Sequence, residues 1–518
     1  MLRCNNCGGN YRFDIKTQKI VCPYCENSVD PEEMDKFEAK TYDTYKYECP
    51  QCGGSINADD NEASVFCPYC GLSTMLEGKL SKASSPDYII PFKKTKEECV
   101  SAYKKTVRKA IYAPRRFKKE GNSESFRGVY IPYWNYDVKQ GDVDLEGVDP
   151  QIDLSNEKTV LQTYKMEIKM DTEYKGINFD ASEAFDDELS NSIAPFNLEE
   201  KKAFAPGYVS GFYADNTDVA SKTYQSRAKN MASDYTLKEV NKRKESKRFK
   251  AKISKEKNLH ILNNASVIEK PGVGLMPVWF MSWKYGDRIA YACVNGQTGK
   301  ASGKIPASSL KYLLFSLITA IPLFFILNIF TMPRPEVAVV MSNVLALIIL
   351  LIYDTYLHRS VVKDEMGRIN KDKYSSNVII KPTKANKNIR NLLIIGLAVG
   401  IPLYYVSIYF SMYYVAVFLW INVAIAILEI ILTFTSIVKD IKKASQKRVA
   451  FIGIIVAAIV SSIVLWVDPI SDVFFYLTSV VTLVLSGIAF LDLIHYHNML
   501  TTIPMPQFAK KGGDDDAE

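Results

Sequence analysis

Hydrophobic residues are distributed unevenly along the chain. Between residues 310 and 498 they form runs of about 20 residues with almost no charge, the length that a helix needs to cross the hydrocarbon core of a bilayer. In residues 1–309, charged residues recur throughout and no such run occurs. The pattern predicts a charged N-terminal part of mixed structure, followed by an apolar helical part.

The apolar part predicts an all-α polytopic transmembrane domain of six helices over residues 309–498, followed by a polar tail, 499–518. We expect the helices at 310–330, 337–357, 391–410, 413–438, 449–467 and 470–495. The loops 358–390 and 439–448 carry nine and five basic residues, whereas the loops on the other side hold only Arg334. By the positive-inside rule, this pattern predicts a multi-pass membrane protein with both chain ends in the cytoplasm.

The N-terminal part is almost neutral, which bears on its partners. Of the formal net charge of +7, residues 1–309 contribute little, since they hold 46 basic and 43 acidic residues. A nucleic-acid-binding domain usually has a clear basic excess. A nucleic-acid partner is therefore not our leading expectation, although the basic run from Lys242 to Lys257 keeps that alternative open.

Eight of the ten cysteines lie in the first 70 residues, as four CxxC pairs. Adding 45 to each position of the first two pairs gives the second two, and the flanking Cys-Gly-Gly and Cys-Pro-Tyr-Cys residues repeat as well. Such regularity indicates a duplicated unit. The candidate ligands are Cys4, Cys7, Cys22 and Cys25 in the first unit and Cys49, Cys52, Cys67 and Cys70 in the second.

The spacing predicts two zinc ribbons, over residues 1–38 and 39–84. Each CxxC turn points two thiolates at one point in space, and two such turns supply the four sulfurs that tetrahedral Zn²⁺ prefers. Four thiolates leave no open coordination position, so both Zn²⁺ ions should be structural. Metal binding would also stabilise units too small to fold on a core of their own. An iron centre of rubredoxin type and a redox dithiol are the alternatives.

Residues 85–308 predict an α+β domain on the cytoplasmic side. Thr95 and Glu98 form a capping box at the start of an amphipathic helix. The segments 130–134 and 275–279 both follow the pattern apolar-x-Pro-x-Trp, and we expect them to pair as strands of one sheet with their tryptophans in a shared core. Together with the ribbons and the helices, this makes a multidomain protein.

The sequence offers few catalytic or transport signals. It has four histidines and no recognised hydrolase, metalloprotease or kinase motif, so we expect no enzymatic activity. The segment 296–300 has only two residues between its glycines and is not a phosphate-binding loop. Glu429 and Asp492 lie in predicted spans and are candidate functional groups, because an intramembrane carboxylate is costly.

Several segments together resemble a known family. These are the paired ribbons with Cys-Pro-Tyr-Cys, then Ile-Ile-Pro-Phe at 89–92, Gly-Val-Tyr-Ile-Pro-Tyr-Trp at 128–134, Gly-Tyr-Val-Ser-Gly-Phe-Tyr-Ala at 207–214, Pro-Val-Trp at 277–279 and Asn-Gly-Gln-Thr-Gly at 295–299. They resemble the Gram-positive bacterial membrane proteins labelled as TFIIB-type zinc ribbon proteins, sometimes named PriA-like helicases. The chain has no Walker A motif, so helicase activity is not expected. The resemblance implies a bacterial cell membrane location and an accessory role beside membrane-stress proteins.

Three hypotheses for the function follow. The first is a membrane-anchored scaffold or adaptor whose zinc ribbons recruit a cytosolic or membrane protein partner, in envelope maintenance or membrane stress. The second is a transporter or channel regulated by its zinc-ribbon domain, with Glu429 in the transport path. The third is a membrane-tethered nucleic-acid binder that uses the ribbons and the basic run. The oligomeric state is left open.

Overall fold

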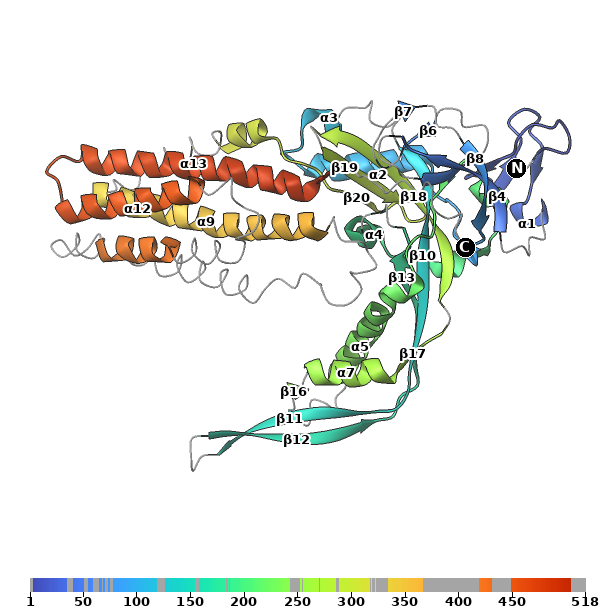
Figure 1. Cartoon of the computed structure of the whole chain (residues 1–518), viewed down its shortest axis with the longest axis horizontal. Coiled ribbons are helices and arrows are strands. Elements are labelled where there is room, and N and C mark those ends of the chain that lie inside the picture. The colour runs from blue at the N-terminus through green and yellow to red at the C-terminus, as the bar shows by residue number, and fades with distance from the viewer. Residues whose placement is uncertain are drawn as a thin grey trace, which may run out of the picture.

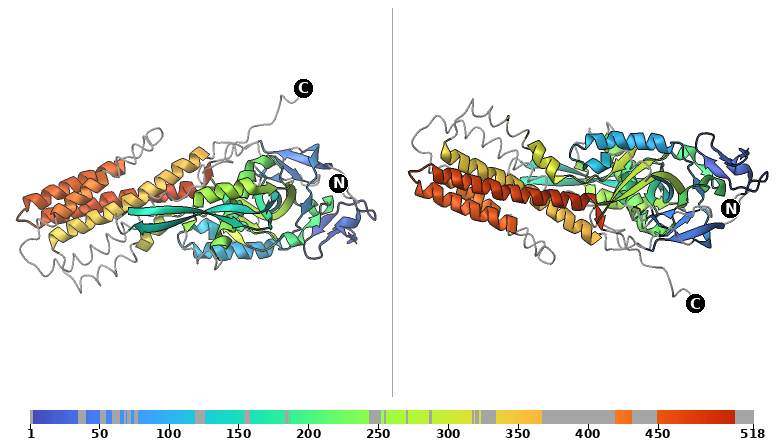
Figure 2. Two further views of the ribbon diagram at one scale, coloured as in Figure 1. Left: turned by 90° about the horizontal axis from the view of Figure 1, so that it is seen from below. Right: turned by 90° about the horizontal axis from the view of Figure 1, so that it is seen from above.

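The protein is elongated, with a sheet-rich body between a small N-terminal lobe and a bundle of apolar helices (Figure 1, Figure 2). It is seen in a computed structural model. The residues that the structure describes are 3–34, 41–50, 55–58, 65–67, 69, 73–74, 78–118, 126–153, 158–182, 185, 187–242, 252–253, 255–269, 271–285, 288–316, 318, 322, 334–366, 419–430 and 449–504.

A mixed sheet of 13 strands forms the body. Its main path runs β14 (Lys202–Ala203), β9 (Tyr88–Ile89), β18 (Gly272–Tyr285), β10 (Arg127–Gln140), β15 (Tyr213–Ala214), β5 (Ser55–Ala58), β4 (Thr41–Glu48) and β8 (Gly78–Ser84). Off this path are β13 (Thr172–Asp180), β17 (Ser266–Ile268), β19 (Arg288–Asn295), β20 (Ala301–Gly303) and β21 (Ile503–Pro504). Strands β4, β5 and β8 come from the predicted second ribbon, so this unit is part of the large sheet.

The longest strands, β10 and β18, pair antiparallel and carry the two apolar-x-Pro-x-Trp segments. Tyr130 lies opposite Pro277, and Pro132 lies opposite Leu275, which confirms the predicted pairing. The expected shared tryptophan core is wrong. Trp279 packs in a core with Phe92, whereas Trp134 packs against a different cluster and donates its Nε1–H to the carbonyl of Val219 at 2.8 Å.

Both faces of the central strands are apolar, so each face has its own core. The side chains of β19 alternate between them, with Ala290, Ala292 and Val294 in the first core and Ile289, Tyr291 and Cys293 in the second. Alternation along a strand with apolar residues on both sides is typical of a sheet covered on both faces. The first core includes residues of ribbon 1 and α2 (Lys96–Lys109), and the second includes residues of ribbon 2 and α4 (Asp187–Ile193).

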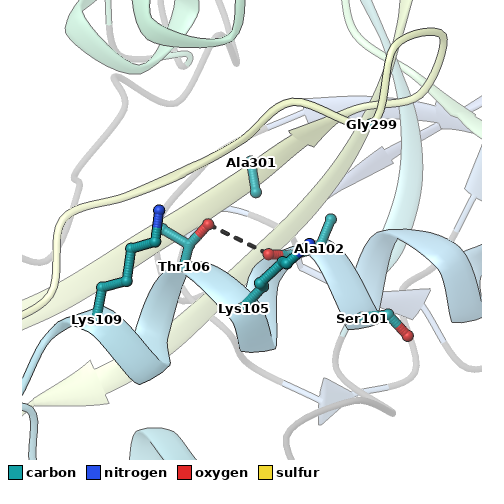
Figure 3. Close-up of a pocket in the computed structure, with 7 residues that line it drawn as sticks. All are labelled: Ser101, Ala102, Lys105, Thr106, Lys109, Gly299 and Ala301. Carbon is teal, nitrogen blue, oxygen red and sulfur yellow. Dashed lines mark hydrogen bonds between the residues drawn. The ribbon is translucent and has the colours of Figure 1, made fainter.

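Helix α2 begins at the predicted capping box and covers the first face. The backbone N–H of Glu98 donates to Thr95 Oγ1 at 3.4 Å, and the N–H of Thr95 donates to Glu98 Oε2 at 2.8 Å. Cys99, Tyr103 and Val107 are buried on one side of the helix. An open groove of about 430 Å³ lies between α2 and the chain near Gly299 (Figure 3).

A two-stranded arm, β11 (Val143–Asp153) and β12 (Lys158–Ile168), extends from the far end of β10 (Figure 1). Strand β16 (Lys252–Ile253) pairs with the middle of β11. The base of the arm packs in a small core under two helices, α5 (Gln225–Lys242) and α7 (Lys255–Ala265). The remaining short helices are α1 (Pro31–Met34), α3 (Arg115–Lys118), η2 (Leu198–Glu200), η3 (Pro206–Val209) and η4 (Ser221–Tyr224).

The apolar bundle contains α9 (Pro335–Met366), α12 (Val449–Val467), α13 (Val473–Thr501) and the short helix Leu419–Ile430. Unlike a water-soluble protein, the bundle has an apolar surface and polar groups in its interior. Large apolar side chains are exposed, for example Leu477, Val484 and Ile488 of α13, while polar side chains such as Asn343 and Asn422 are fully buried. Asn343 donates its Nδ2–H to Asn422 Oδ1 at 2.7 Å, and Asn422 Nδ2 donates to Ser462 Oγ at 2.8 Å, so these polar groups link three helices.

The predicted fold class, with a separate six-helix all-α transmembrane domain, is wrong. In the part of the chain that the structure describes, only Pro335–Tyr353 within α9 and Val473–Thr501 are long and apolar enough to cross a membrane. The helix Leu419–Ile430 and the apolar segment Ile452–Val467 of α12 are shorter. The predicted span 391–410 lies outside the described residues. Hydropathy counts consecutive apolar residues and cannot show how many of them form one continuous helix.

The bundle is joined to the sheet at the end of α13. Strand β21 follows this helix and pairs with β19, placing Ile503 opposite Ile289. The Arg288 guanidinium donates from Nη2 to the carbonyl oxygens of Met499 at 3.1 Å and Thr502 at 2.9 Å. A cation on the last carbonyls of a helix satisfies groups that have no partner within the helix. Asn498 adds a second connection, because its Oδ1 accepts from the N–H of Ala307 at 2.7 Å.

We expect Arg288→Ala to loosen this junction. Hydrogen bonds to a charged group contribute about 1.5–3 kcal/mol each, so amide hydrogens of residues 499–503 should exchange at least about tenfold faster. Hydrogen exchange with mass spectrometry on the full chain measures this. Lys284→Ala, which removes an exposed cation from the neighbouring strand β18, is the matched control. Unchanged exchange in the Arg288 variant would mean that the β19–β21 pairing alone holds the helix end.

Candidate metal centre

The N-terminal lobe, ribbon 1, is a three-stranded sheet with two turns that carry cysteines. The strands are β1 (Arg12–Asp14), β2 (Lys19–Val21) and β3 (Ser28–Val29). In the first turn the N–H of Gly8 donates to the carbonyl of Cys4 at 2.8 Å, and in the second the N–H of Glu26 donates to that of Cys22 at 2.9 Å. Gly8 and Glu26 have φ values of 73° and 57°. In each turn, the residue after the second cysteine therefore adopts the left-handed conformation.

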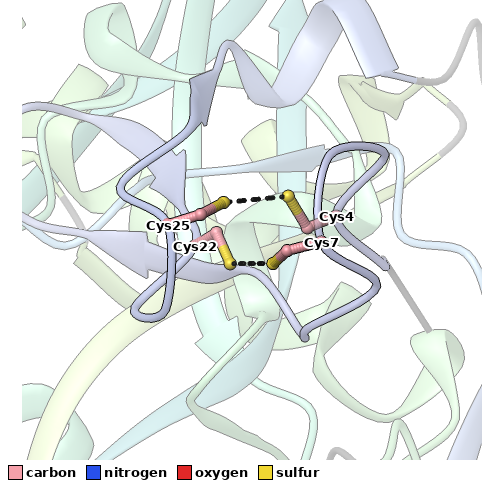
Figure 4. A group of neighbouring side chains, drawn as sticks. All are labelled: Cys4, Cys7, Cys22 and Cys25. Carbon is pink, nitrogen blue, oxygen red and sulfur yellow. Dashed lines mark hydrogen bonds between the residues drawn. The ribbon is translucent and has the colours of Figure 1, made fainter.

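The two turns bring Cys4, Cys7, Cys22 and Cys25 together (Figure 4). Their Sγ atoms all lie within 4.8 Å of one another, with 3.5 Å between Cys4 and Cys25 and 3.4 Å between Cys7 and Cys22. A tetrahedral ion bound by four thiolates at about 2.3 Å separates the sulfurs by about 3.8 Å. The four cysteines are thus placed to hold one metal ion, with no position left for a substrate.

Neighbouring polar groups shift the pKa values of these thiols. Burial raises the pKa of Cys4, but hydrogen bonds with the Tyr11 hydroxyl and with backbone N–H groups outweigh it and lower this pKa to about 6. At Cys7, a hydrogen bond from the Gly9 N–H lowers the pKa of the thiol. Hydrogen bonds with the thiols of Cys22 and Cys25, together with burial, outweigh this effect and raise the pKa of Cys7 to about 12. At Cys22, as at Cys4, burial is outweighed by hydrogen bonds with backbone N–H groups and with neighbouring thiols, which lower its pKa. A metal ion binds thiolates, so it would displace the protons that remain on the four thiols.

Ribbon 1 is seated on the body by the segment 207–214, one of the segments that carried the family resemblance. The N–H of Phe13 donates to the carbonyl of Ser210 at 3.0 Å, and the Ser210 hydroxyl donates to the carbonyl of Tyr11 at 2.6 Å. The Phe13 ring lies 5.4 Å from that of Tyr208. A Cβ on Gly207 would lie 3.2–3.3 Å from atoms of Ile20 and Pro31, so glycine permits the close approach. Sequence reasoning gave this segment no function.

The second predicted site is described only in part. Cys49 and Cys67 are buried in the second core, whereas Cys52 and Cys70 lie outside the described residues. The short strands β6 (Val65–Phe66) and β7 (Ser73–Thr74) pair antiparallel, as β2 and β3 do 45 residues earlier in ribbon 1. The described residues therefore show one cluster of four cysteines, in ribbon 1.

The two Cys-Pro-Tyr-Cys turns have opposite environments despite identical residues. Tyr24 in ribbon 1 is 77% exposed, and its equivalent in ribbon 2, Tyr69, is 2% exposed. The carbonyl of Tyr69 accepts a hydrogen bond from the Tyr291 hydroxyl of the sheet, and its own hydroxyl lies beside Asp215. Tyr69 is thus packed against the body, while Tyr24 is presented to the surroundings.

Asp215 is a buried carboxyl group beneath ribbon 2. Ser182 donates its hydroxyl to Asp215 Oδ2, and the N–H of Asn216 donates to Oδ1 at 2.8 Å. Burial, followed by the charge of Asp218, raises the pKa of Asp215 to about 7 against the lowering effect of these hydrogen bonds. Sequence reasoning missed this residue, because its burial depends on a ribbon more than 140 positions earlier in the chain.

The other predicted candidates do not join the cysteine site. Glu429 is fully buried inside the helix bundle, and Asp492 is half-buried on α13. The described ends of the basic run are engaged in ion pairs, Lys242 with Glu239 at 2.6 Å and Lys257 with Glu146 at 2.8 Å. Residues 243–251 and 254 of the run lie outside the described residues.

We expect Cys22→Ser to remove one metal equivalent per chain. Three thiolates and a hydroxyl bind a soft cation more weakly, and the lobe has too small a core to keep its fold without the ion. Elemental analysis of the purified full chain measures the loss. Cys99→Ser, which changes a buried cysteine of α2, is the control and should leave the metal content unchanged. Equal metal content in both variants would contradict the assignment of the site.

Asp215 should make the body less stable as the pH rises. The folded state binds a proton that the unfolded state releases near pH 4, so the stability falls between about pH 4 and pH 7 and is constant above. Asp215→Asn removes the proton-binding group and should flatten this part of the profile, raising the melting temperature at pH 8 relative to wild type. Thermal unfolding at pH 5 and pH 8 tests this. A wild-type profile that is already flat would contradict it.

Comparisons with known proteins give one relative. No family model matches the chain, and no solved structure matches it. The chain is 32% identical over 317 residues to the uncharacterized protein YdjG of Bacillus subtilis (strain 168). The alignment covers 59% of this chain and 90% of YdjG. With nine-tenths of the relative matched at this identity, the chain belongs to the family of the uncharacterized Bacillus subtilis protein YdjG.

Proposed function

We propose that the protein is a membrane-anchored scaffold that recruits a protein partner through ribbon 1. The single observation that carries this proposal is the exposed Cys22-Pro23-Tyr24-Cys25 turn at the end of the molecule opposite the apolar helices (Figure 1). Tyrosine held rigidly on a surface is a frequent anchor of protein interfaces. The closed four-cysteine site would fix this turn, since the metal leaves no position for catalysis.

Ribbon 1 holds Tyr24 in place by covalent and steric constraints. The residue lies between two candidate metal ligands, Cys22 and Cys25, so its backbone is restrained once the ion is bound. Its ring lies over Gly9, where an added Cβ would come within 2.6 Å of the ring. A side chain that is already ordered loses little conformational entropy on binding, which favours affinity. These constraints support recruitment by this turn.

Membrane anchoring by α9 and α13 completes the proposal. The two helices pass the length and composition criteria for a membrane span, and their exposed surface is apolar while polar groups are buried between helices. That arrangement suits a lipid environment, because hydrogen-bonded polar groups inside a bundle avoid hydrocarbon. We place the ribbons in the cytoplasm, where thiols stay reduced and available to a metal.

We further propose that the metal is zinc and that ribbon 2 holds a second ion. Closed tetrathiolate sites with CxxC turns favour Zn²⁺. Ribbon 2 repeats the cysteine spacing of ribbon 1, and its described cysteines, Cys49 and Cys67, are both buried at the body. In this scheme the second ion holds ribbon 2 against the sheet, and the first ion shapes the recruiting turn. Elemental analysis of the full chain should therefore find two zinc ions.

Tyr24→Ala should weaken partner recruitment without loss of metal. Removing an anchoring tyrosine commonly costs 2 kcal/mol or more, so capture should fall by about thirtyfold. The measurement is a crosslinked pull-down of the full chain from native membranes, compared between variants after nuclease treatment. Tyr235→Ala, which removes a 49% exposed tyrosine of α5, is the matched control.

The outcomes separate the competing functions. A protein that survives nuclease, is captured by wild type and the Tyr235 variant, and is lost with Tyr24→Ala supports the scaffold. Recovery that depends on nucleic acid would favour the nucleic-acid tether. Equal capture by all three proteins would mean that ribbon 1 is not the recruiting module.

A further inference from the structure

The charges of α2 are segregated along its length. Its acidic residues, Glu97 and Glu98, lie in the first turn, and Glu98 pairs with Lys94 at 2.9 Å. The other half carries Lys104, Lys105, Arg108 and Lys109, and Arg115 follows in α3. Within the described part of the chain, none of these five cations forms an ion pair, and all but Lys104 are exposed. The end of α2 is therefore a surface of uncompensated positive charge.

Two large apolar side chains lie directly beyond this basic end. Ile111 is 52% exposed and Tyr112 is 37% exposed. The helix dipole accounts for cations in the last turn of α2, but it gives no reason to expose an isoleucine and a tyrosine beside them. Basic, aromatic and aliphatic residues side by side are typical of a surface that lies in the headgroup region of a membrane.

The same end of α2 is attached to the root of the apolar bundle. The N–H of Ser308 donates to the carbonyl of Tyr112 at 2.9 Å, and the Tyr112 ring lies 4.7 Å from the ring of Tyr312. Residues 309–316 continue from this contact as a helix with exposed apolar side chains, among them Leu310 and Leu314. Both views in Figure 2 place α2 along the body with one end toward the helices. The basic surface thus meets the apolar surface where the bundle leaves the body.

The groove beside α2 adds a concave feature of suitable size. Ser101, Lys105, Thr106 and Lys109 line it on one side, and Gly299 and Ala301 on the other, around a volume of about 430 Å³. Figure 3 shows Lys109 rising from α2 on the side of Ala301. The hydroxyls of Ser101 and Thr106 donate to backbone carbonyls of α2, at 2.9 Å and 3.2 Å. Among the side chains that line the groove, the two lysines are therefore the donors available to a ligand. A mobile ammonium group is a point charge that suits phosphate.

We propose that the basic end of α2 and the adjoining groove bind the phosphate headgroups of anionic phospholipids. The proposal rests on the membrane anchoring proposed above. Lys105 and Lys109 hold a headgroup phosphate at the groove, while Ile111 and Tyr112 enter the interfacial layer beside the apolar helices. Charge complementarity selects the leaflet rich in anionic lipid, so the contact fixes the sheet body against that membrane surface.

Lysine reactivity on the reconstituted full chain tests this. Nanodiscs of phosphatidylcholine alone are compared with nanodiscs that also contain phosphatidylglycerol, and the rate of reductive methylation at each lysine is followed by mass spectrometry. We expect Lys105 and Lys109 to react at least about threefold more slowly on the anionic discs, with the effect reduced at high salt. Lys16 and Lys19 of ribbon 1, at the other end of the molecule, should react equally on both. Equal rates at Lys105 and Lys109 would overturn the proposal.

Two further experiments distinguish a lipid phosphate from a soluble phosphate compound, and a third tests the membrane anchoring separately. Inorganic phosphate added to phosphatidylcholine discs should leave both lysines reactive, and protection by it would assign the groove to a soluble phosphate compound instead. Lys105→Gln/Lys109→Gln should retain less phosphatidylglycerol after purification in detergent than Lys16→Gln/Lys19→Gln, and equal retention would count against the site. Carbonate extraction measures separately whether the chain is integrated into the membrane. A chain that resists extraction but shows no lysine protection loses only this inference.

Discussion

The antiparallel pairing of β10 with β18 is the interaction on which the rest of the structure depends. It joins two segments almost 150 residues apart and creates strands whose side chains are apolar on both faces. A sheet of this kind is stable only when both faces are covered. Ribbon 1 and α2 cover one face, and ribbon 2 and α4 cover the other. Both duplicated cysteine units are therefore packed against the body and contribute residues to its two cores.

Local patterns in the sequence predicted local structure well. The capping box at Thr95, the pairing of the two proline-containing strands and the cluster of Cys4, Cys7, Cys22 and Cys25 all depend on residues close in sequence or repeated in it. The environments of the repeats could not be predicted in this way. Tyr24 and Tyr69 have the same neighbours in the chain, and only the contact of Tyr69 with distant residues of the sheet makes one exposed and the other buried.

The helical part shows a different limit of sequence reasoning. Apolar composition predicted helices correctly at α9, α12 and α13. Within the described residues it predicted more full-length spans than the two that are found, because a hydropathy window ignores where a helix ends. It also gave no sign of the junction with the body, where Arg288 holds the last carbonyls of α13 and β21 joins the sheet. Such contacts form between segments more than 200 positions apart in the chain.

The junction shows how the sheet connects the two ends of the molecule. Strand β19 pairs with β18 on one side and with β21 at the end of α13 on the other, so a continuous hydrogen-bonded path connects the apolar helices to the strand that pairs with β10. The segment that seats ribbon 1 ends in β15, which also pairs with β10. The exposed turn of ribbon 1 and the apolar bundle are therefore attached to the same rigid sheet from opposite ends. In the scaffold that we propose, a sheet tied at both ends in this way would hold the recruiting turn at a fixed distance and orientation from the membrane, which a flexible linker would not do.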